Sequence, residues 1–495
     1  MAPNLNDDIL SQRLGKYGRF GVHLGLSRIQ RLLAALDNPQ NHVPIVHVAG
    51  TNGKGSVCAY LSAVLEQAGY RVGRYTSPHL VSWCERICIN NIPITPADLM
   101  HALDQVEAVI VREQPDEAIA PSHETPTQFE VFTAAAWTYF AQQSVDLAVI
   151  EVGLGGRLDA TNVVDQPLVT VVTSLSREHW QRLGPTLADI AGEKAGVLKT
   201  RRPAVIGPLP EEAEKVVLDR AVALDCPILR PLPAQPDKEG YAVYTDEADP
   251  AASQLRYSLP FPGEHQLINS AIAIATLHCL CNQGWQISDQ AIQDGIAKAR
   301  WPGRLQWLTW RAPDKRSYNW LIDGAHNPAA AKVLRAYIDA ISRPNPSPLE
   351  ARALHQQGLS VPLEGPITWL MGMLSTKDHA DVFRELLRPG DRLHLVPVPD
   401  HAFMEPDALR EIALAVCPTL TNCATYEGLE AGLQGAISET AGLKILCGSL
   451  YLVGNFFQTQ ATNLFEPTNR MVGKPFHEPT LIKRVNNEDA HFPKG

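Results

Sequence analysis

The sequence predicts an α/β protein with a P-loop-type parallel-sheet domain at the N-terminus and a smaller Rossmann-like α/β domain at the C-terminus. Three observations support this fold class. Apolar runs of strand length alternate with helical patterns, a glycine-rich loop follows the first of these runs, and the alternation starts again after residue 306. Such alternation is typical of a mostly parallel sheet with helices on both faces.

The first part of the chain carries the elements of the larger predicted domain. Strands are predicted at Ile45–Val48, Leu147–Glu151, Leu168–Thr173 and Ala204–Ile206. Helical patterns lie between them, for example at Phe129–Phe140 and Leu187–Leu198. Residues 240–260 alternate more like antiparallel strands and predict a local sheet.

The motif Trp301-Pro302-Gly303-Arg304 interrupts this pattern and marks a linker around residues 300–306. Four more strands are predicted at Trp320–Asp323, Thr368–Met371, Arg392–Val396 and Lys444–Cys447. Helices are predicted at Ala329–Ile341, Ala380–Leu387, Asp407–Val416 and Leu429–Glu439. We therefore predict a first domain over 1–303, a second over 304–460 and a polar tail over 461–495, with a proline-rich surface insertion at 344–366.

The composition is that of an ordinary globular protein, with 45% hydrophobic and 19% charged residues in a chain of 495. This length requires more than one hydrophobic core. The formal net charge of −10 disfavours a nucleic-acid partner, and no segment has the apolar length that crosses a bilayer. Nine cysteines without a CxxC pair, and a polar N-terminus without a signal-peptide pattern, lead us to expect a cytoplasmic protein, which we also expect to be a monomer.

The glycine-rich loop is the strongest single feature. It follows the strand that ends near Ala49 and consists of Gly50, Thr51, Asn52, Gly53, Lys54, Gly55 and Ser56. Its glycines can turn backbone N–H groups toward a phosphate, Lys54 supplies a charge for the β- and γ-phosphates, and Ser56 supplies a hydroxyl for Mg²⁺. The spacing departs from the full P-loop pattern, which places a glycine where this chain has Val48. The loop predicts an ATP-binding, ATPase-type domain, and a tight turn with a surface lysine is the alternative.

A second loop, from Glu151 to Asn162, follows another predicted strand. The strand brings Glu151 to its carboxyl end, where open α/β sheets bind ligands. Glu151 is suited to Mg²⁺, which takes one or two carboxylates together with phosphate oxygens. The alternative is a flexible loop whose charges face water.

Several other polar residues carry weaker signals. His179 follows a predicted strand, Ser77 lies in a turn, and Lys194 ends a predicted helix where the helix dipole favours a cation. Asp323 and His326 follow a strand of the second domain and could face a cleft between the domains. Taken singly, each of them fits an ordinary structural role equally well.

Ten motifs in sequence order resemble the folylpolyglutamate synthase/dihydrofolate synthase family of the Mur ligase superfamily. The resemblance spans about residues 10–460 and consists of GTNGKGS, SPHL…ERI, TQFE, EVGLGGRLDATN, EHWQRLG, EKAG, GEHQLINSA, WPGR, DGAHNP and GSLYLVG. It implies an ATP-dependent ligase that adds L-glutamate to dihydropteroate, to the γ-carboxyl of a folate, or to both. A bifunctional enzyme is our first expectation. Phosphorylation of the acid supplies the good leaving group that a carboxylate lacks.

The resemblance also implies roles for individual residues. Ser77, Glu151 and His179 would bind Mg²⁺, and Lys194 would carry a CO₂-derived carbamate that serves a second Mg²⁺ site. Nucleotide contacts would come from the glycine-rich loop and from Asn269, Arg304, Asp323 and His326. The pterin or folate would be lined by Thr127, Gln128, Phe129, Glu130, Leu158, Asp159 and Ala160. The loop Pro78–Asn91 would become ordered when folate binds.

One departure and two alternatives remain open. The family usually has Asp before the metal histidine, whereas this chain has Glu178, which puts the metal geometry in doubt. A Mur-type ligase acting on another acid is one alternative, although the loop starts too early for a UDP-binding domain before it. A non-catalytic ATP-binding protein on the same scaffold is the other. The set Lys54, Glu151, His179 and Lys194 speaks against it, because simple binding needs no paired metal site.

Overall fold

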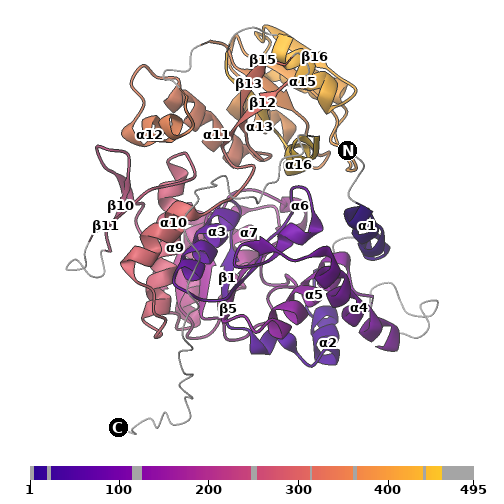
Figure 1. Ribbon diagram of the computed structural model, residues 1–495, viewed down its shortest axis with the longest axis vertical. Helices are drawn as coiled ribbons and strands as arrows, with labels where there is room; N and C mark the ends of the chain where they lie inside the picture. The colour runs from indigo at the N-terminus through magenta and orange to yellow at the C-terminus, as the bar shows by residue number, and fades with distance from the viewer. Residues whose placement is uncertain are drawn as a thin grey trace, which may run out of the picture. The chain divides into compact units, whose positions relative to one another are not determined.

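The structure is a computed structural model that describes residues 5–18, 24–113, 125–246, 254–312, 315–359, 365–438 and 442–459. Residues Met1–Thr462 form one compact unit (Figure 1). Within it we call the part built on an eight-stranded sheet the first lobe and the part built on a six-stranded sheet the second lobe. The predicted tail 461–495 lies outside the described residues, and the predicted boundary between 303 and 304 stays a prediction.

The sheet of the first lobe has the strand order β4-β3-β2-β5-β1-β6-β7-β8. Its strands are β1 (Ile45–Ala49), β2 (Val72–Tyr75), β3 (Ile87–Ile89), β4 (Ile92–Pro93), β5 (Leu147–Glu151), β6 (Val169–Val172), β7 (Ala204–Ile206) and β8 (Ile228–Leu229). Pairing is parallel from β2 to β8, and β3 and β4 add an antiparallel edge. The register pairs Val48 with Glu151, so β1 and β5 end at the same edge of the sheet.

Helices cover both faces of this sheet, because successive strand residues point to opposite sides. In β5, Leu147 and Val149 pack into one core with α3 (Lys54–Gln67), α9 (His265–Cys281) and α10 (Asp289–Lys298). Ala148 and Ile150 pack into another, with α1 (Leu5–Gly18), α2 (Ser27–Ala35), α4 (Pro96–Glu113) and α5 (Gln128–Gln142). A third cluster forms under α7 (Leu187–Ala195) and α8 (Glu211–Ala223). Figure 1 shows α3 and α9 apart from α2, α4 and α5.

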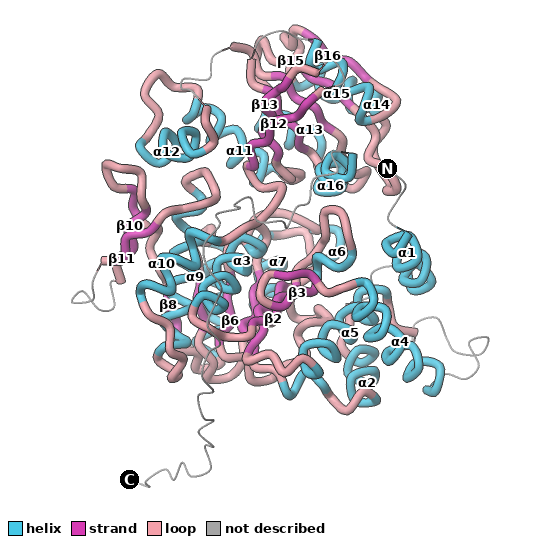
Figure 2. The backbone as a smooth tube through the Cα atoms, in the orientation of Figure 1, coloured by secondary structure: helices cyan, strands magenta, loops and turns pink. Residues whose placement is uncertain are grey.

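A small antiparallel sheet follows in the chain. It consists of β9 (Gln235–Pro236), β10 (Ala242–Tyr244) and β11 (Leu255–Tyr257), and β10 pairs with both neighbours. Figure 2 shows β10 and β11 as a separate ribbon beside α10. The antiparallel sheet expected over residues 240–260 is confirmed.

The sheet of the second lobe has the order β12-β13-β17-β14-β15-β16. Its strands are β12 (Gln306–Arg311), β13 (Ser317–Ile322), β14 (Thr368–Met371), β15 (Arg392–Leu395), β16 (Asn422–Thr425) and β17 (Lys444–Cys447). Only β12 is antiparallel, to β13. The helices are α11 (Pro328–Ile341), α13 (His379–Leu386), α14 (Pro406–Val416), α15 (Leu429–Ser438) and α16 (Leu450–Thr459). The predicted α/β fold class with two sheets is confirmed.

The segment predicted as a surface insertion, 344–366, contains the helix α12 (Pro348–Gln356), which the sequence analysis did not anticipate. Ser347 caps this helix by accepting a hydrogen bond from the Glu350 N–H, and Pro348 occupies the first helical position. Leu349 and Leu354, which belong to α12, are buried. Residues 360–364 of the insertion lie outside the described residues.

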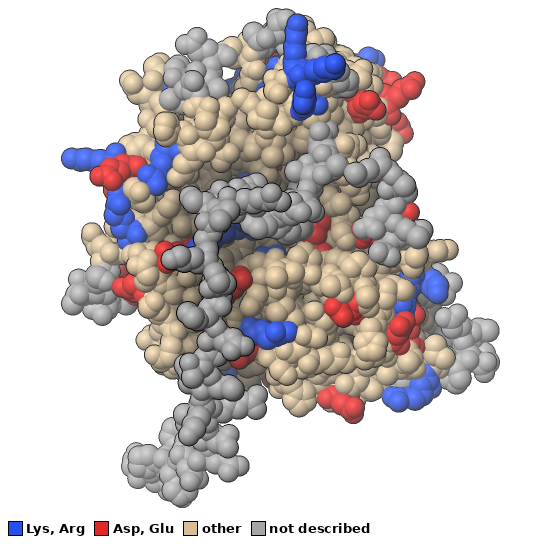
Figure 3. All heavy atoms as spheres, viewed as in Figure 1, with Lys and Arg blue, Asp and Glu red and all other residues tan. Residues whose placement is uncertain are grey.

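Charged side chains of both signs are scattered over the face that Figure 3 draws. In the described parts of the chain, no helix is both long and apolar enough to cross a membrane.

Candidate active site

The glycine-rich loop connects β1 directly to α3, as the sequence predicts. Gly53 has a φ of 85°, which a glycine adopts without strain. A Cβ atom at this position would lie 2.5 Å from Oδ1 of Asn269, so the loop passes close under the α9 side chain. The Thr51 N–H donates to the Ser174 carbonyl at 2.6 Å, which ties the loop to the segment after β6.

Two lysines hold the carbonyl groups of this loop. Lys54 Nζ donates to the carbonyls of Gly50 at 3.1 Å and Thr51 at 3.0 Å. Lys194 Nζ, from the last turn of α7, donates to the same Gly50 carbonyl at 2.8 Å. Lys194 is buried, and burial, together with the charge of Lys54, lowers its pKa to about 7. A lysine with this pKa is partly neutral at physiological pH, so its amine can act as a nucleophile.

Three predicted metal ligands meet at the edge where β2, β5 and β6 end. The Ser77 N–H donates to Glu151 Oε2 at 3.2 Å, and Lys54 Nζ lies 4.0 Å from Glu151 Oε1. Burial raises the pKa of Glu151, and the charge of Lys54 opposes this rise. His179 follows β6 and has a φ of 52°. Burial lowers the pKa of His179 to about 4, against the charge of Glu178, so its ring is neutral as a metal ligand must be.

These side chains suit a divalent cation. Glu151 is a buried carboxylate that accepts the Ser77 N–H and has Lys54 4.0 Å away, and a divalent cation would further offset the burial of its charge. In the described residues, no group of three or more His, Cys, Asp or Glu side chains is arranged to hold a metal ion by itself. Mg²⁺ beside phosphates usually takes one or two carboxylates and fills its other positions with phosphate oxygens and water, and Glu151 can serve as such a carboxylate.

Residues after α10 bring the second lobe to this edge. The Asp323 carboxylate accepts the N–H groups of Leu305 and Ala325, both at 2.8 Å. Burial raises the pKa of Asp323, and the charge of Arg304 opposes the shift. Asp323 therefore fixes the start of the second lobe next to Arg304.

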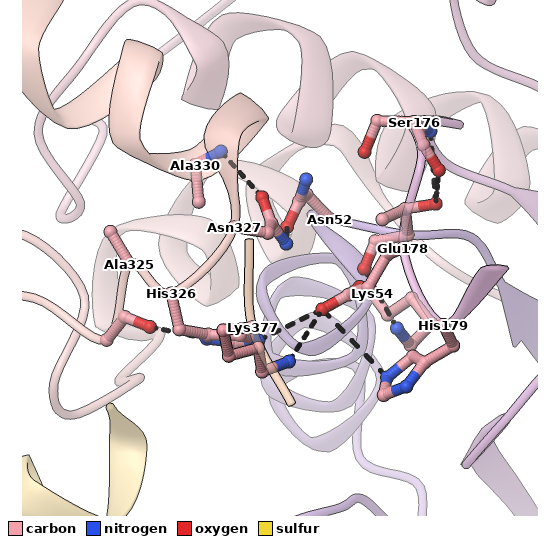
Figure 4. A network of polar contacts seen from close by, with 12 residues as sticks. Asn52, Lys54, Ser176, Glu178, His179, Ala325, His326, Asn327, Ala330 and Lys377 are labelled. Carbon is pink, nitrogen blue, oxygen red and sulfur yellow. Dashed lines mark hydrogen bonds and ion pairs between the residues drawn. The ribbon is translucent and has the colours of Figure 1, made fainter. Parts of the chain in front are cut away.

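Glu178 joins the two lobes. Its Oε1 lies 3.1 Å from His326 Nε2 and 3.3 Å from Lys377 Nζ, and both of these residues belong to the second lobe (Figure 4). His326 Nδ1 lies 2.7 Å from the Gly324 carbonyl, so both ring nitrogens face an oxygen acceptor. Burial alone would raise the pKa of Glu178, but the hydrogen bond with His326 and the neighbouring cations hold it well below its ordinary value. Glu178, which stands where the family usually has Asp, thus links the first lobe to the second through these two contacts.

The predicted nucleotide residues line one cavity of about 420 Å³, which we call the loop cavity. The predicted residues in its wall are Thr51, Asn52, Gly53, Lys54, Gly55, Ser56, Ser77, Glu151, His179, Asn269, Arg304, Asp323 and His326. Lys194 does not line this cavity. It donates a hydrogen bond to the carbonyl of Gly50, which directly precedes the wall residue Thr51.

A second cavity, of about 390 Å³, which we call the Phe129 cavity, collects most of the predicted folate-site residues. Thr127, Phe129, Glu130, Leu158, Asp159 and Ala160 line it, and Gln128 does not. Glu130 accepts the Thr127 N–H at 2.7 Å, and its Oε1 lies 3.0 Å from Nη2 of Arg28. Glu130 is therefore engaged in a helix cap and an ion pair.

The two cavities share part of their walls. The common residues are Ser77, Pro78, Gly153, His179, His326 and Leu450. A molecule in each cavity would meet its neighbour at this shared wall, next to the predicted metal ligands.

Several cavity residues were not predicted as site residues. The Phe129 cavity is also lined by Arg86, Lys377, Ser449 and Tyr451. Arg86 lies in the ERI motif and Ser449 in GSLYLVG, so the resemblance marked their segments but gave them no role. No signal in the sequence pointed to Lys377.

Comparisons with known proteins match both lobes. A model of the Mur ligase middle domain matches residues 48–277, and a model of the dihydrofolate synthetase C-terminal domain matches 306–459. The chain is 37% identical over 329 residues to a dihydrofolate synthase/folylpolyglutamate synthase of Bacillus subtilis strain 168, which covers 64% of this chain and 72% of that protein.

Solved structures agree. Mycobacterium tuberculosis folylpolyglutamate synthase complexed with ADP has a TM-score of 0.76 at 29% identity, covering 92% of this chain and 99% of that one. The bifunctional folylpolyglutamate synthase/dihydrofolate synthase of Yersinia pestis, complexed with AMPPNP and Mn ion, has a TM-score of 0.73 at 28% identity and covers 92% and 98%.

The fold, the glycine-rich loop and these matches define an ATP-dependent ligase of the Mur type. More narrowly, the chain belongs to the dihydrofolate synthase/folylpolyglutamate synthase family. The family resemblance drawn from the ten motifs is confirmed.

Proposed function

We propose that this enzyme uses ATP to join L-glutamate to a pterin-linked acid, either dihydropteroate or the γ-carboxyl of a folate, and that it accepts both. The observation that carries the proposal is the shared wall between the loop cavity and the Phe129 cavity. It lets an acid in the Phe129 cavity bring its carboxylate to the terminal phosphate of a nucleotide in the loop cavity. The names of the relatives support this choice of substrates.

The reaction requires two bond exchanges. A carboxylate oxygen of the acid attacks the γ-phosphorus of ATP, the bond to ADP breaks, and an acyl phosphate forms. The glutamate amine then attacks the acyl carbon and phosphate leaves. Since an anion attacks an anion in the first step, positioning and charge neutralisation provide most of the catalysis.

The chain's own residues supply these effects. Lys54 would exchange its two carbonyl partners for phosphate oxygens, while the loop N–H groups surround the same phosphates. Asn269, Arg304 and Asp323 would contact the nucleotide from α9 and the second lobe. Glu151, Ser77 and His179 would hold Mg²⁺, which neutralises phosphate charge when bound. Phe129 and Leu158 would offer apolar surface to the pterin and aminobenzoyl rings.

We also propose that Lys194 is carbamylated. Its amine would bond to the carbon of CO₂ and lose a proton, which turns a cation into an anionic oxygen donor for a second Mg²⁺. A buried amine with a pKa of about 7, directly beneath the loop, supports this proposal.

The test is an ADP-release assay with ATP, Mg²⁺ and L-glutamate, run separately with dihydropteroate and with tetrahydrofolate. We expect glutamate-dependent turnover with both acceptors and products heavier by one glutamyl residue. Turnover with another acid alone would favour a different Mur-type ligase. Nucleotide binding without turnover on any acid would favour the non-catalytic alternative.

A further inference from the structure

Arg86 is a cation without an acidic partner in the Phe129 cavity. It lines the cavity at the end of the short helix Trp83–Arg86, directly before β3. In the described part of the chain, its one side-chain hydrogen bond runs from Nε to Nδ1 of His79, at 2.8 Å. Its side chain is partly buried, and among those residues the carboxylates of Glu85 and Glu151 act on its charge without lying within 4.0 Å as ion-pair partners.

The surroundings of Arg86 fix its orientation. The guanidinium carbon lies 4.4 Å from the centre of the Trp83 ring and 5.7 Å from that of Phe132. Burial lowers the pKa of His79 to about 2, so the His79 ring is neutral and can accept the Nε–H. With Nε engaged and one face covered by Trp83, the two terminal nitrogens keep their N–H donors for a ligand. Such a fork matches a carboxylate in a bidentate manner.

The nearest acidic residue in sequence is not available to Arg86. Glu85 accepts the N–H groups of Leu80 at 2.8 Å, Val81 at 2.8 Å and Ser82 at 2.7 Å. Its carboxylate therefore holds the loop that leads to Arg86. Two other basic residues in the wall, His326 and Lys377, face Glu178. Among the described residues of the cavity wall, Arg86 is thus a cation whose guanidinium has no carboxylate within hydrogen-bond reach.

We propose that Arg86 binds a carboxylate of the acceptor acid in the Phe129 cavity and thereby determines that this cavity takes acids. This inference rests on the proposed function, because it assumes a pterin-linked acceptor. The carboxylate can come from two sources. Dihydropteroate has one carboxylate, which reacts, whereas a folate also has an α-carboxylate that does not react.

Binding measurements test the inference separately from catalysis. The probes are pteroate and its primary carboxamide, titrated calorimetrically into the full-length protein with Mg²⁺ and AMPPNP. The wild type should bind the acid at least about tenfold more tightly than the amide, as a charge-assisted bidentate pair implies. Arg86→Gln should reduce this preference to within about twofold, and Arg86→Lys should keep part of it.

The α-carboxamide and the γ-carboxamide of folate then identify the source. Suppose that one of the two amides binds the wild type more weakly than folate does, but binds Arg86→Gln with the same affinity as folate. The carboxylate that this amide replaces is then the one that Arg86 binds. Arg410→Gln, an exposed arginine on α14 that pairs with Asp407, is the control and should leave every preference unchanged. Thermal melting checks that each variant is folded. If Arg86→Gln does not fold, the same titrations are made with Arg86→Lys, whose preference for the acid should be smaller than that of the wild type.

The inference is overturned if the wild type binds acids and amides equally, if it binds neither pteroate nor folate, or if the acid preference survives in Arg86→Gln. Failure of the proposed function looks different, because the acids would then bind with an Arg86-dependent preference while no glutamate-dependent ADP release occurs.

Discussion

Lys54 and Lys194 donate to the same Gly50 carbonyl, and each has a different further use. Lys54 also bonds Thr51 and lies 4.0 Å from Glu151, so its charge is already placed among the groups expected around the phosphates. Lys194 is buried beneath the loop. The two proposed roles, phosphate binding by Lys54 and carbamylation of Lys194, thus correspond to two depths in the same small cluster.

We predict that Lys54→Ala lowers kcat by about 10²–10³-fold or more, because one preorganised charge at the reacting phosphate is lost. ADP release measures this effect, and circular dichroism should show an unchanged fold. Lys215→Ala, an exposed lysine on α8 that pairs with Asp219, is the matched control. Near-normal turnover in Lys54→Ala would contradict the phosphate role.

We predict that Lys194 takes up CO₂ increasingly as the pH rises through about 7. Carbamylation needs the neutral amine, and a pKa of about 7 makes the neutral fraction rise about tenfold between pH 6 and pH 8. At constant dissolved ¹³CO₂, the ¹³C NMR carbamate signal should follow this rise and disappear in Lys194→Ala. Full activity of Lys194→Ala in CO₂-free buffer would refute the modification.

At this scale the sequence predicts the place of the glycine-rich loop between β1 and α3 and its position in a cavity wall, because these depend on local spacing, while the roles of Lys54 and Ser56 stay predictions. The carboxylate-binding role proposed for Arg86 could not be predicted from the sequence. It depends on which side chains surround the guanidinium in the folded chain, namely the rings of His79 and Trp83, and on the lack of a carboxylate within reach. The contact between Glu178 and His326 joins residues far apart in the sequence and needs the folded chain.

At the scale of secondary-structure elements, the N-terminal cap of α5 forms part of the Phe129 cavity wall. The α5 cap pairs Thr127 with Glu130, and Arg28 from α2 adds an ion pair. The α7 cap pairs Thr186 with Asp189 and is exposed. The same local motif therefore has a buried and a surface version in this chain.

We predict that Glu130→Ala lowers the free energy of unfolding by roughly 3 kcal/mol, because it removes a buried helix cap and breaks the ion pair with Arg28. Urea denaturation measures the change. Asp189→Ala removes the equivalent cap residue of α7 without breaking an ion pair, and its loss should be clearly smaller. Equal losses in the two variants would mean that the ion pair with Arg28 adds nothing.

About half of the regular elements could be predicted from the sequence, chiefly the buried strands; β2, β3, β4 and β8 of the first sheet were not predicted. The predicted bounds of β5, β7, β14 and β17 coincide with the structure, because buried parallel strands are short apolar runs between polar turns. The edge strand β12 was missed, since its alternating pattern adjoins the linker and its pairing with β13 is antiparallel. Helix α12 was missed because prolines and polar residues dominate its segment.

At the scale of the whole molecule, Glu178 connects the lobes through His326 and Lys377, and Asn327 adds a contact of 3.2 Å with Asn52 of the glycine-rich loop (Figure 4). The domain boundaries themselves stay predictions.

We predict that Glu178→Ala lowers kcat/KM for ATP about tenfold or more and increases the radius of gyration in small-angle scattering. Without the carboxylate, the second lobe loses the hydrogen bond of His326 and the ion pair of Lys377 to the first lobe. Glu178→Asp keeps the charge but shortens its reach, so its effects should be intermediate. An unchanged radius of gyration together with wild-type kinetics in Glu178→Ala would show that this contact does not hold the lobes.

The shared wall of the two cavities has a consequence for inhibitor chemistry. A single compound that tethers a pterin-type ring system to an adenine nucleotide through a short acyl-phosphate mimic would engage both cavities at once. Its second half would bind at a high effective concentration, so its affinity should exceed that of either half by orders of magnitude without any new contact.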